Sequence, residues 1–222
     1  MNQRVFDREM EGVKDKILKM GMMVQELIFK SIEALRAQDR EKAEAVIRDD
    51  ENVDQLELEI NEQCIQLVAL RQPEASDLRF LMTGMRIAND LERMGDLAED
   101  IAERAIELMG EPLLKPLVDI PRMAKIAEES IGVVLEAFVV RDAGKAKAVW
   151  EKETESDRLR DMIHAELTEI MKKDASTVVR ALPLLLISRH LERICDHATN
   201  IAEEVIYMVE GTVVKHGGGG RV

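Results

Sequence analysis

Acidic side chains recur at four-residue spacing in four stretches of the chain, two in each half. In an α-helix this spacing places them one above another on a single face, where like charges repel by about a few tenths of a kcal/mol per pair. A bound cation would remove this repulsion, and clustered carboxylate oxygens are ligands for hard and borderline cations. The sequence therefore predicts two metal-binding clusters, the first made of Asp50, Asp54, Glu92, Asp96 and Asp100, and the second of Glu153, Asp157, Glu192, Asp196 and Asn200.

The elements that position these residues are helices. Apolar residues recur at three- and four-residue steps, for example at Val13, Ile17, Met20, Val24 and Leu27, which is the pattern of an amphipathic helix. The composition agrees, because aromatic residues make up only 3% of the chain, whereas sheets draw heavily on aromatic and β-branched side chains. We expect six helices, over residues 5–38, 40–71, 76–109, 119–141, 143–173 and 176–210.

The second half of the chain repeats the first. Residues 34–56 and 137–159 are identical at eight of 23 aligned positions, and residues 91–106 and 191–206 at nine of 16. The offset changes from 103 to 100 between these stretches, in the loop between the second and third helix of each half. The sequence thus predicts an all-α fold of two tandem antiparallel three-helix bundles, over residues 1–110 and 117–212, joined by a proline-rich linker within residues 110–121.

The repeat also predicts which carboxylates face each other. Antiparallel helices joined by a tight turn bring two residues to the same height when both lie equally far from that turn. Asp54 and Asp96 are equally far from the turn near residue 75, and Asp157 and Asp196 from the turn near residue 176. We therefore expect each acidic set to line one seam between two adjacent helices.

Charge and motifs limit the function. A net charge of −13 argues against binding to nucleic acids, and no uncharged run approaches the length of about 18 residues that a membrane span needs. Cys64 and Cys195 are far apart in the sequence, as expected of reduced core cysteines in a cytoplasmic protein. The N-terminus has no apolar signal region, and the glycine-rich tail, residues 213–222, is expected to be disordered.

Three alternatives stay open at this point. The acids could form a solvated face relieved by Arg93 and Arg193, so that the protein is a helical adaptor without metal. His164 or His197 could join a metal site, although isolated histidines are more often surface or capping residues. A ferritin-like carboxylate enzyme would need two ExxH motifs, and the sequence contains none. Because no phosphate-binding loop, nucleophile elbow or HExxH motif occurs either, we do not expect an enzyme.

Two segments carry a resemblance to a known family. Residues 90–96 (DLERMGD) and 190–203 (HLERICDHATNIAE) resemble the PhoU family, regulators of bacterial phosphate uptake, and the resemblance extends over about residues 6–208. Asn200 departs from the acidic pattern of the family, and Leu97 stands where the second repeat has His197. The two clusters are therefore expected to differ in charge and in metal occupancy.

The resemblance implies a cytoplasmic homodimer that represses phosphate-starvation genes when phosphate is plentiful. Its implied partners are the ATPase subunit of the phosphate ABC transporter and a sensor histidine kinase, so that it reaches the membrane only through them. The implied metal at the acidic positions is iron, with zinc, manganese, nickel or magnesium as alternatives.

Overall fold

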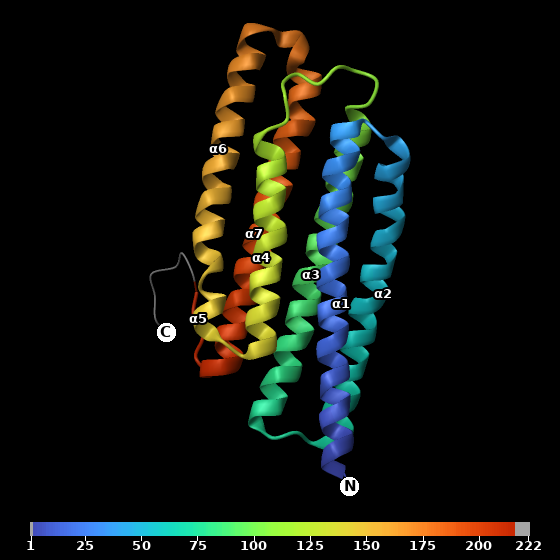
Figure 1. Ribbon diagram of the computed structural model, residues 1–222, viewed down its shortest axis with the longest axis vertical. Coiled ribbons are helices and arrows are strands. Elements are labelled where there is room, and N and C mark those ends of the chain that lie inside the picture. Colours follow the sequence, from blue (N-terminus) through green and yellow to red (C-terminus); the bar gives the residue numbers. More distant parts are fainter. Residues whose placement is uncertain (1, 216–222) are drawn as a thin grey trace.

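The amphipathic repeats of the sequence form long helices in the structure, a computed structural model that describes residues 2–215 (Figure 1). The first bundle contains α1 (Asn2–Ala37), α2 (Arg40–Arg71) and α3 (Ala75–Glu107). The second contains α4 (Asp119–Val140), α5 (Ala143–Ala146), α6 (Val149–Lys173), the 3₁₀ turn η1 (Ala175–Thr177) and α7 (Val178–Glu210). The prediction of an all-α fold with two tandem antiparallel three-helix bundles is confirmed.

The first turn of each bundle is built in the same way. Gln38 adopts a left-handed conformation with φ of 49°, and the Asp39 side chain then caps α2 by accepting a hydrogen bond from the backbone N–H of Lys42 at 3.1 Å. At the equivalent positions of the second repeat, Arg141 has a φ of 53°, and the Asp142 side chain accepts a hydrogen bond from the backbone N–H of Lys145 at 3.0 Å. Because these caps fix where the second helix of each bundle begins, they also set the height of its acidic residues.

One predicted helix is wrong in detail, because residues 143–173 do not form a continuous helix. The short α5 ends at Ala146, and hydrogen bonds of the i→i−3 type, from Ala148 N to Lys145 O and from Trp150 N to Lys147 O, lead into α6. The first repeat, whose α2 is unbroken, has Glu41 where the second has Gly144. Glycine has a low helix propensity, which favours the break in the second repeat.

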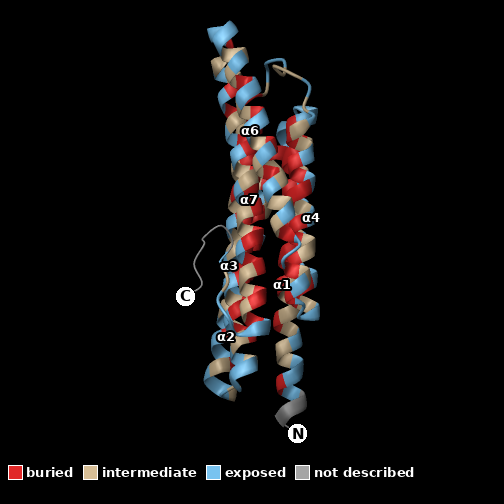
Figure 2. Ribbon diagram, turned by 90° about the vertical axis from the view of Figure 1, so that its left-hand side faces the viewer, coloured by how far each residue is buried: buried red, intermediate tan, exposed pale blue. Residues whose placement is uncertain are grey.

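The two bundles lie side by side and share one hydrophobic core (Figure 1). α3 and α7 form the most extensive contact between them, and α1 also packs against α4. Buried residues line the inward faces of the helices and exposed residues the outward faces (Figure 2). Phe80 on α3 stacks against Phe138 on α4, with ring centroids 5.2 Å apart, so that aromatic packing joins the bundles directly.

The contact between α1 and α4 depends on a glycine. A Cβ atom added to Gly21 would overlap Cδ1 of Leu135. The missing side chain therefore lets the two helices approach closely enough for Leu135 to be buried between them.

No helix within residues 2–215 is both long and apolar enough to cross a lipid bilayer. Of the tail predicted to be disordered, residues 213–215 follow α7 without regular secondary structure. The rest of that tail, from His216, lies outside the described residues.

Candidate metal centre

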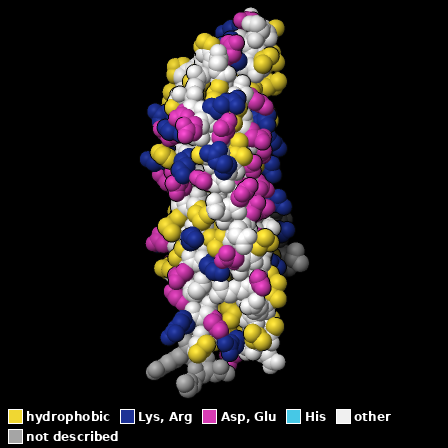
Figure 3. Space-filling view, turned by 90° about the vertical axis from the view of Figure 1, so that its right-hand side faces the viewer, with side chains coloured by type: hydrophobic (Ala, Val, Ile, Leu, Met, Phe, Trp, Pro, Cys, Tyr) yellow, Lys and Arg dark blue, Asp and Glu magenta, His cyan; other side chains and the backbone are white. Residues whose placement is uncertain are grey.

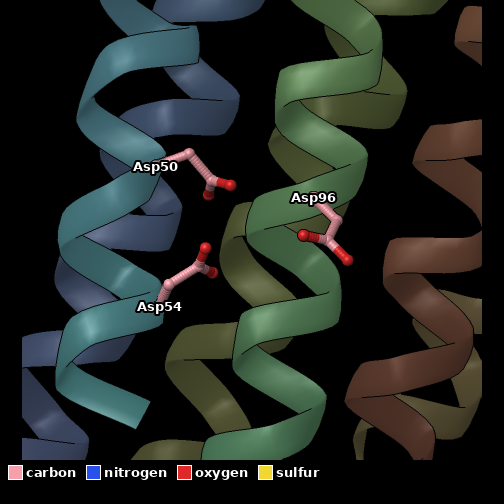
Figure 4. Close-up of side chains that lie close together, drawn as sticks. All are labelled: Asp50, Asp54 and Asp96. Atoms are coloured by element: carbon pink, nitrogen blue, oxygen red, sulfur yellow. The ribbon is translucent and has the colours of Figure 1, made fainter. Parts of the chain in front are cut away.

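Three carboxylates of the first cluster converge between α2 and α3. Asp50 and Asp54 project from successive turns of α2, and Asp96 lies opposite them on α3 (Figure 4). One oxygen from each of the three lies within 4.8 Å of the others. Oxygens this close from three acidic side chains can share a single cation, and they repel one another without it.

Asp50 is the buried member of this group. It is only 3% exposed, and its Oδ1 atom has no hydrogen-bond partner within residues 2–215. A Cβ atom added to Gly95 on α3 would overlap this same oxygen, so glycine at position 95 provides the space that the Asp50 carboxylate occupies. A buried acceptor without a partner is costly, and a cation between α2 and α3 would supply what Oδ1 lacks.

The electrostatics of the cluster favour protonation or a bound cation. Burial, and then the charge of Asp54, raises the pKa of Asp50 to about 7. Burial and the charge of Asp96 likewise raise the pKa of Asp54 and of Glu92. The exposed Arg93 side chain donates to Asp96 Oδ2 at 2.9 Å and lies 3.3 Å from Glu92 Oε2, so it compensates these charges at the rim.

The fifth predicted residue of the first cluster lies elsewhere. Oδ2 of Asp100 is 3.6 Å from Nδ1 of His190 on α7, so this carboxylate faces the second bundle. Its neighbour Glu99, which the four-residue spacing did not single out, has a pKa raised by burial and by Glu103 and Asp96, and its charge acts on Asp50. The turn symmetry that pairs Asp96 with residue 54 could have identified Glu99, since it pairs position 99 with position 51, next to Asp50.

Adding a methyl group at position 95 should weaken metal binding at this cluster. In Gly95→Ala the new Cβ pushes the Asp50 carboxylate away from Asp54 and Asp96, and we expect roughly a tenfold loss of affinity for Mn²⁺, measured by titration calorimetry. Gly132→Ala is the matched control, because a Cβ there lies 3.5 Å from Gln25 Nε2, an ordinary contact. The control should keep its Mn²⁺ affinity, and equal affinities for both variants would contradict the positioning role of Gly95.

The second cluster is arranged differently around a basic residue. Nη1 of Arg160 on α6 donates to Asp157 Oδ1 at 3.0 Å and also to Glu192 on α7. The carboxylates predicted here are therefore drawn to a guanidinium, and within residues 2–215 only Asp50, Asp54 and Asp96 meet as a group of convergent ligands.

The remaining acids of the second cluster keep polar neighbours. Oε2 of Glu153 accepts a hydrogen bond from Thr199 Oγ1 at 3.1 Å. Burial, and then the charges of Glu192 and Glu153, raises the pKa of Asp196 to about 6. Cys195 stands where the first repeat has Gly95, and burial raises the pKa of its thiol to about 12.

The histidines and Asn200 lie along other contacts. Nδ1 of His197 is 2.9 Å from Asp90 Oδ1, and Nδ2 of Asn200 donates to the same oxygen at 3.5 Å, so both face α3 across the contact between the bundles. Nε2 of His164 is 3.2 Å from the Ser188 hydroxyl. In this structure neither His164 nor His197 lies among the convergent carboxylates.

Acidic side chains are prominent near the middle of the face that α2 presents, where they alternate with lysines and arginines (Figure 3). Exposed charges of this kind are common without any ligand. The first cluster differs from them because its inner carboxylate is buried and its oxygens converge.

Comparison with known proteins gives the family. The chain matches the PhoU domain over residues 17–105 and again over residues 120–205. It is 46% identical over 209 residues to the phosphate-specific transport system accessory protein PhoU homolog of Aquifex aeolicus, covering 94% of this chain and 95% of that protein. It is 33% identical over 214 residues to the PhoU protein of Escherichia coli, covering 96% of this chain and 89% of that protein.

Solved structures agree with these sequence matches. The crystal structure of PhoU from Pseudomonas aeruginosa superposes with a TM-score of 0.88 at 36% identity, covering 93% of this chain and all of the other. The phosphate transport system regulatory protein PhoU from Streptococcus pneumoniae gives a TM-score of 0.89 at 31% identity, covering 95% of this chain and all of the other. Two copies of the family's domain span most of the chain and these relatives align along nearly their full lengths, so the chain belongs to the PhoU family.

Proposed function

We propose that this protein is an accessory regulator of phosphate-specific transport that represses the phosphate-starvation response when phosphate is plentiful. The observation that carries the proposal is the family match in both repeats, together with relatives named as accessory proteins of that transport system. The protein acts by binding and signalling, without turning over a substrate. Long rigid helical faces suit this task, because they offer extended surfaces for docking to other proteins.

The proposed partners are the ATPase subunit of the phosphate ABC transporter and a sensor histidine kinase. The protein works as a cytoplasmic homodimer and reaches the membrane through these partners. Deletion of the resident PhoU gene in a bacterium, followed by expression of this chain, tests the proposal. Repression of a phosphate-starvation reporter at high phosphate should return, and the ATPase subunit or the kinase should co-purify with the chain.

Cognate partners provide the control for this experiment. If repression stays lost although the protein is abundant, the test is repeated with the transporter and kinase from the source of this chain. Failure in that setting as well would refute the regulatory role.

We further propose that a metal ion bound at the first cluster is part of this function. Asp50, Asp54 and Asp96 fit a divalent or ferric cation, because they offer only oxygen ligands and one of these oxygens is buried without a partner among the described residues. We propose iron, the metal that the family resemblance implies. The bound cation would neutralise the carboxylates and hold α2 against α3.

Loss of the outer ligands should remove the metal. Asp54→Ala and Asp96→Ala are each expected to lower bound iron by roughly tenfold or more, measured by elemental analysis of protein purified without an affinity tag. Far-ultraviolet circular dichroism should barely change, because neither side chain belongs to the hydrophobic core. Glu62→Ala, an exposed acid farther along α2, is the control and should keep its metal. If the Asp54→Ala/Asp96→Ala double variant binds as much iron as the wild type, the proposed metal site is wrong and these acids are a solvated acidic face.

A further inference from the structure

The second carboxylate cluster already contains a positive charge. Besides its hydrogen bonds to Asp157 and Glu192, Arg160 donates from Nη2 to Asp161 at 2.9 Å. Its side chain is 20% exposed, and that of Glu192 is 13% exposed. The guanidinium therefore connects carboxylates of α6 and α7 across the same seam at which the first bundle brings together Asp50, Asp54 and Asp96.

The first repeat has an acid at the equivalent position. The repeat offset aligns Arg160 with Glu57 on α2, whose charge helps to raise the pKa of Glu92. The basic residue beside the first cluster is Arg93, whose side chain is 54% exposed and which leaves Oδ1 of Asp50 without a hydrogen-bond partner in the described structure. The second cluster thus has an internal cation, Arg160, whereas the first cluster has an additional carboxylate, Glu57, nearby.

One further difference lowers the negative charge of the second cluster. Thr199 replaces Glu99 and donates its hydroxyl to Glu153. Oε2 of Glu192 is buried without a hydrogen-bond partner within residues 2–215, but Oε1 of the same carboxylate accepts from Arg160. The charge of Glu192 is therefore compensated, although one of its oxygens makes no hydrogen bond.

We propose that Arg160 is the permanent cation of the second cluster, and that divalent metal binds at the first cluster alone. The guanidinium stays protonated at all physiological pH values. A metal ion entering the second cluster would have to displace it and leave a partly buried arginine without its carboxylates, which is strongly unfavourable. This inference rests on the proposed metal binding of the first cluster and assigns different roles to the two repeats: the first responds to metal and the second is held together without it.

Equilibrium dialysis against Mn²⁺ tests this assignment on the full chain. Asp196→Ala, which keeps Arg160, should bind as much Mn²⁺ as the wild type, whereas the Asp54→Ala/Asp96→Ala double variant should lose roughly tenfold or more. Arg160→Glu gives the second cluster the residue type of the first repeat, and it should bind about twice as much Mn²⁺ as the wild type because the competing charge is gone. Arg158→Glu, an exposed position on the same helix, makes the same charge change and should add no bound metal.

The variants separate failure of this inference from failure of the proposed function. A clear loss of Mn²⁺ in Asp196→Ala would show that the second cluster binds metal beside Arg160, and would overturn the inference while metal binding as such survives. Equal and negligible binding in the wild type and the double variant would refute metal binding at the first cluster. Arg160→Glu then still decides the role of Arg160, since gained Mn²⁺ supports it and no gain overturns it. Should Arg160→Glu fail to fold, as judged by circular dichroism, the Asp196→Ala result decides.

Discussion

In the absence of metal at pH 8, Asp50→Asn should be more stable to unfolding than the wild type. The carboxyl group of Asp50 is buried beside other acids, which raises its pKa from 3.8 to about 7. Ionising it above pH 7 therefore opposes folding, and the neutral amide avoids this penalty. We expect a gain of about 2 kcal/mol in the free energy of unfolding, because an uncompensated buried charge costs a few kcal/mol.

The direction of the pH dependence follows from the raised pKa. Below about pH 4 the group is protonated in both the folded and the unfolded state, and its favourable contribution to stability is fully present. This contribution is lost progressively as the pH rises above 4 and through 7, because over this range the unfolded chain ionises the carboxyl at no cost while the folded chain keeps it protonated. Urea unfolding in EDTA should therefore show the wild type losing stability relative to Asp50→Asn between pH 5 and pH 8. A constant difference across this range would contradict the burial of an ionisable Asp50.

Metal should reverse the ranking of the two proteins. Under the proposed metal binding at the first cluster, Mn²⁺ at pH 8 should stabilise the wild type by mass action, whereas Asp50→Asn should gain much less. Thermal unfolding with and without Mn²⁺ measures both gains. Asp77→Asn, at the start of α3 and away from the cluster, is the control and should respond to Mn²⁺ like the wild type.

The second large effect is expected where the two bundles share their core. Phe138→Ala should lower the free energy of unfolding by about 3–5 kcal/mol, because it removes a fully buried aromatic ring and leaves a cavity beside Phe80. Phe29→Ala is the matched control, since that ring is 55% exposed, and its cost should stay below about 1 kcal/mol. Urea unfolding followed by circular dichroism gives both values.

The same experiment shows whether the bundles unfold together. Trp150, the single tryptophan of the chain, lies on α6 in the second bundle. Its fluorescence reports on that bundle, whereas circular dichroism reports on all helices. A shared core predicts coincident transitions by both probes, in the wild type and in Phe138→Ala. Separate transitions would mean that the bundles are independent folding units.

Much of the fold follows from local patterns in the sequence. The apolar periodicity predicts the long helices to within a few residues, and Asp39 and Asp142 mark where the second helix of each bundle begins. The four-residue spacing and the distance from the turn place Asp54 and Asp96 at one height, where the structure has them. These predictions succeed because they depend on the geometry of one helix or of two helices joined by a short turn.

The remaining features depend on contacts between parts that are distant in the sequence. Spacing gives the height of a side chain along a helix, but it does not say which neighbouring helix the side chain faces, and so Asp100 points to α7 while Glu99 acts on the first cluster. The spacing of acids could not predict the role of Arg160 either, because the two repeats differ at this position by a change of charge, from Glu57 to Arg160. The break between α5 and α6 follows a single glycine, Gly144 within α5, in an otherwise helical pattern.

The contact between α3 and α7 is approximately symmetric, because equivalent residues of the two repeats meet on both sides of it. Asp90 on α3 meets Asn200 on α7, and their repeat counterparts, His190 and Asp100, meet in the reverse sense. Such a reciprocal contact is what two copies of a single bundle would make around a twofold axis. A protein half this size could have assembled through the same surface.

When the two copies are joined in one chain, their sequences can differ. In a homodimer of half-length chains, any arginine placed at one cluster would appear at both, and a response to metal would be gained or lost in both halves together. A fused duplicate can keep one half open to a ligand and fix the other permanently. Arg160 at the repeat position of Glu57, and Cys195 at the repeat position of Gly95, are differences that a duplicated and joined chain can hold and a homodimer of half-length chains cannot.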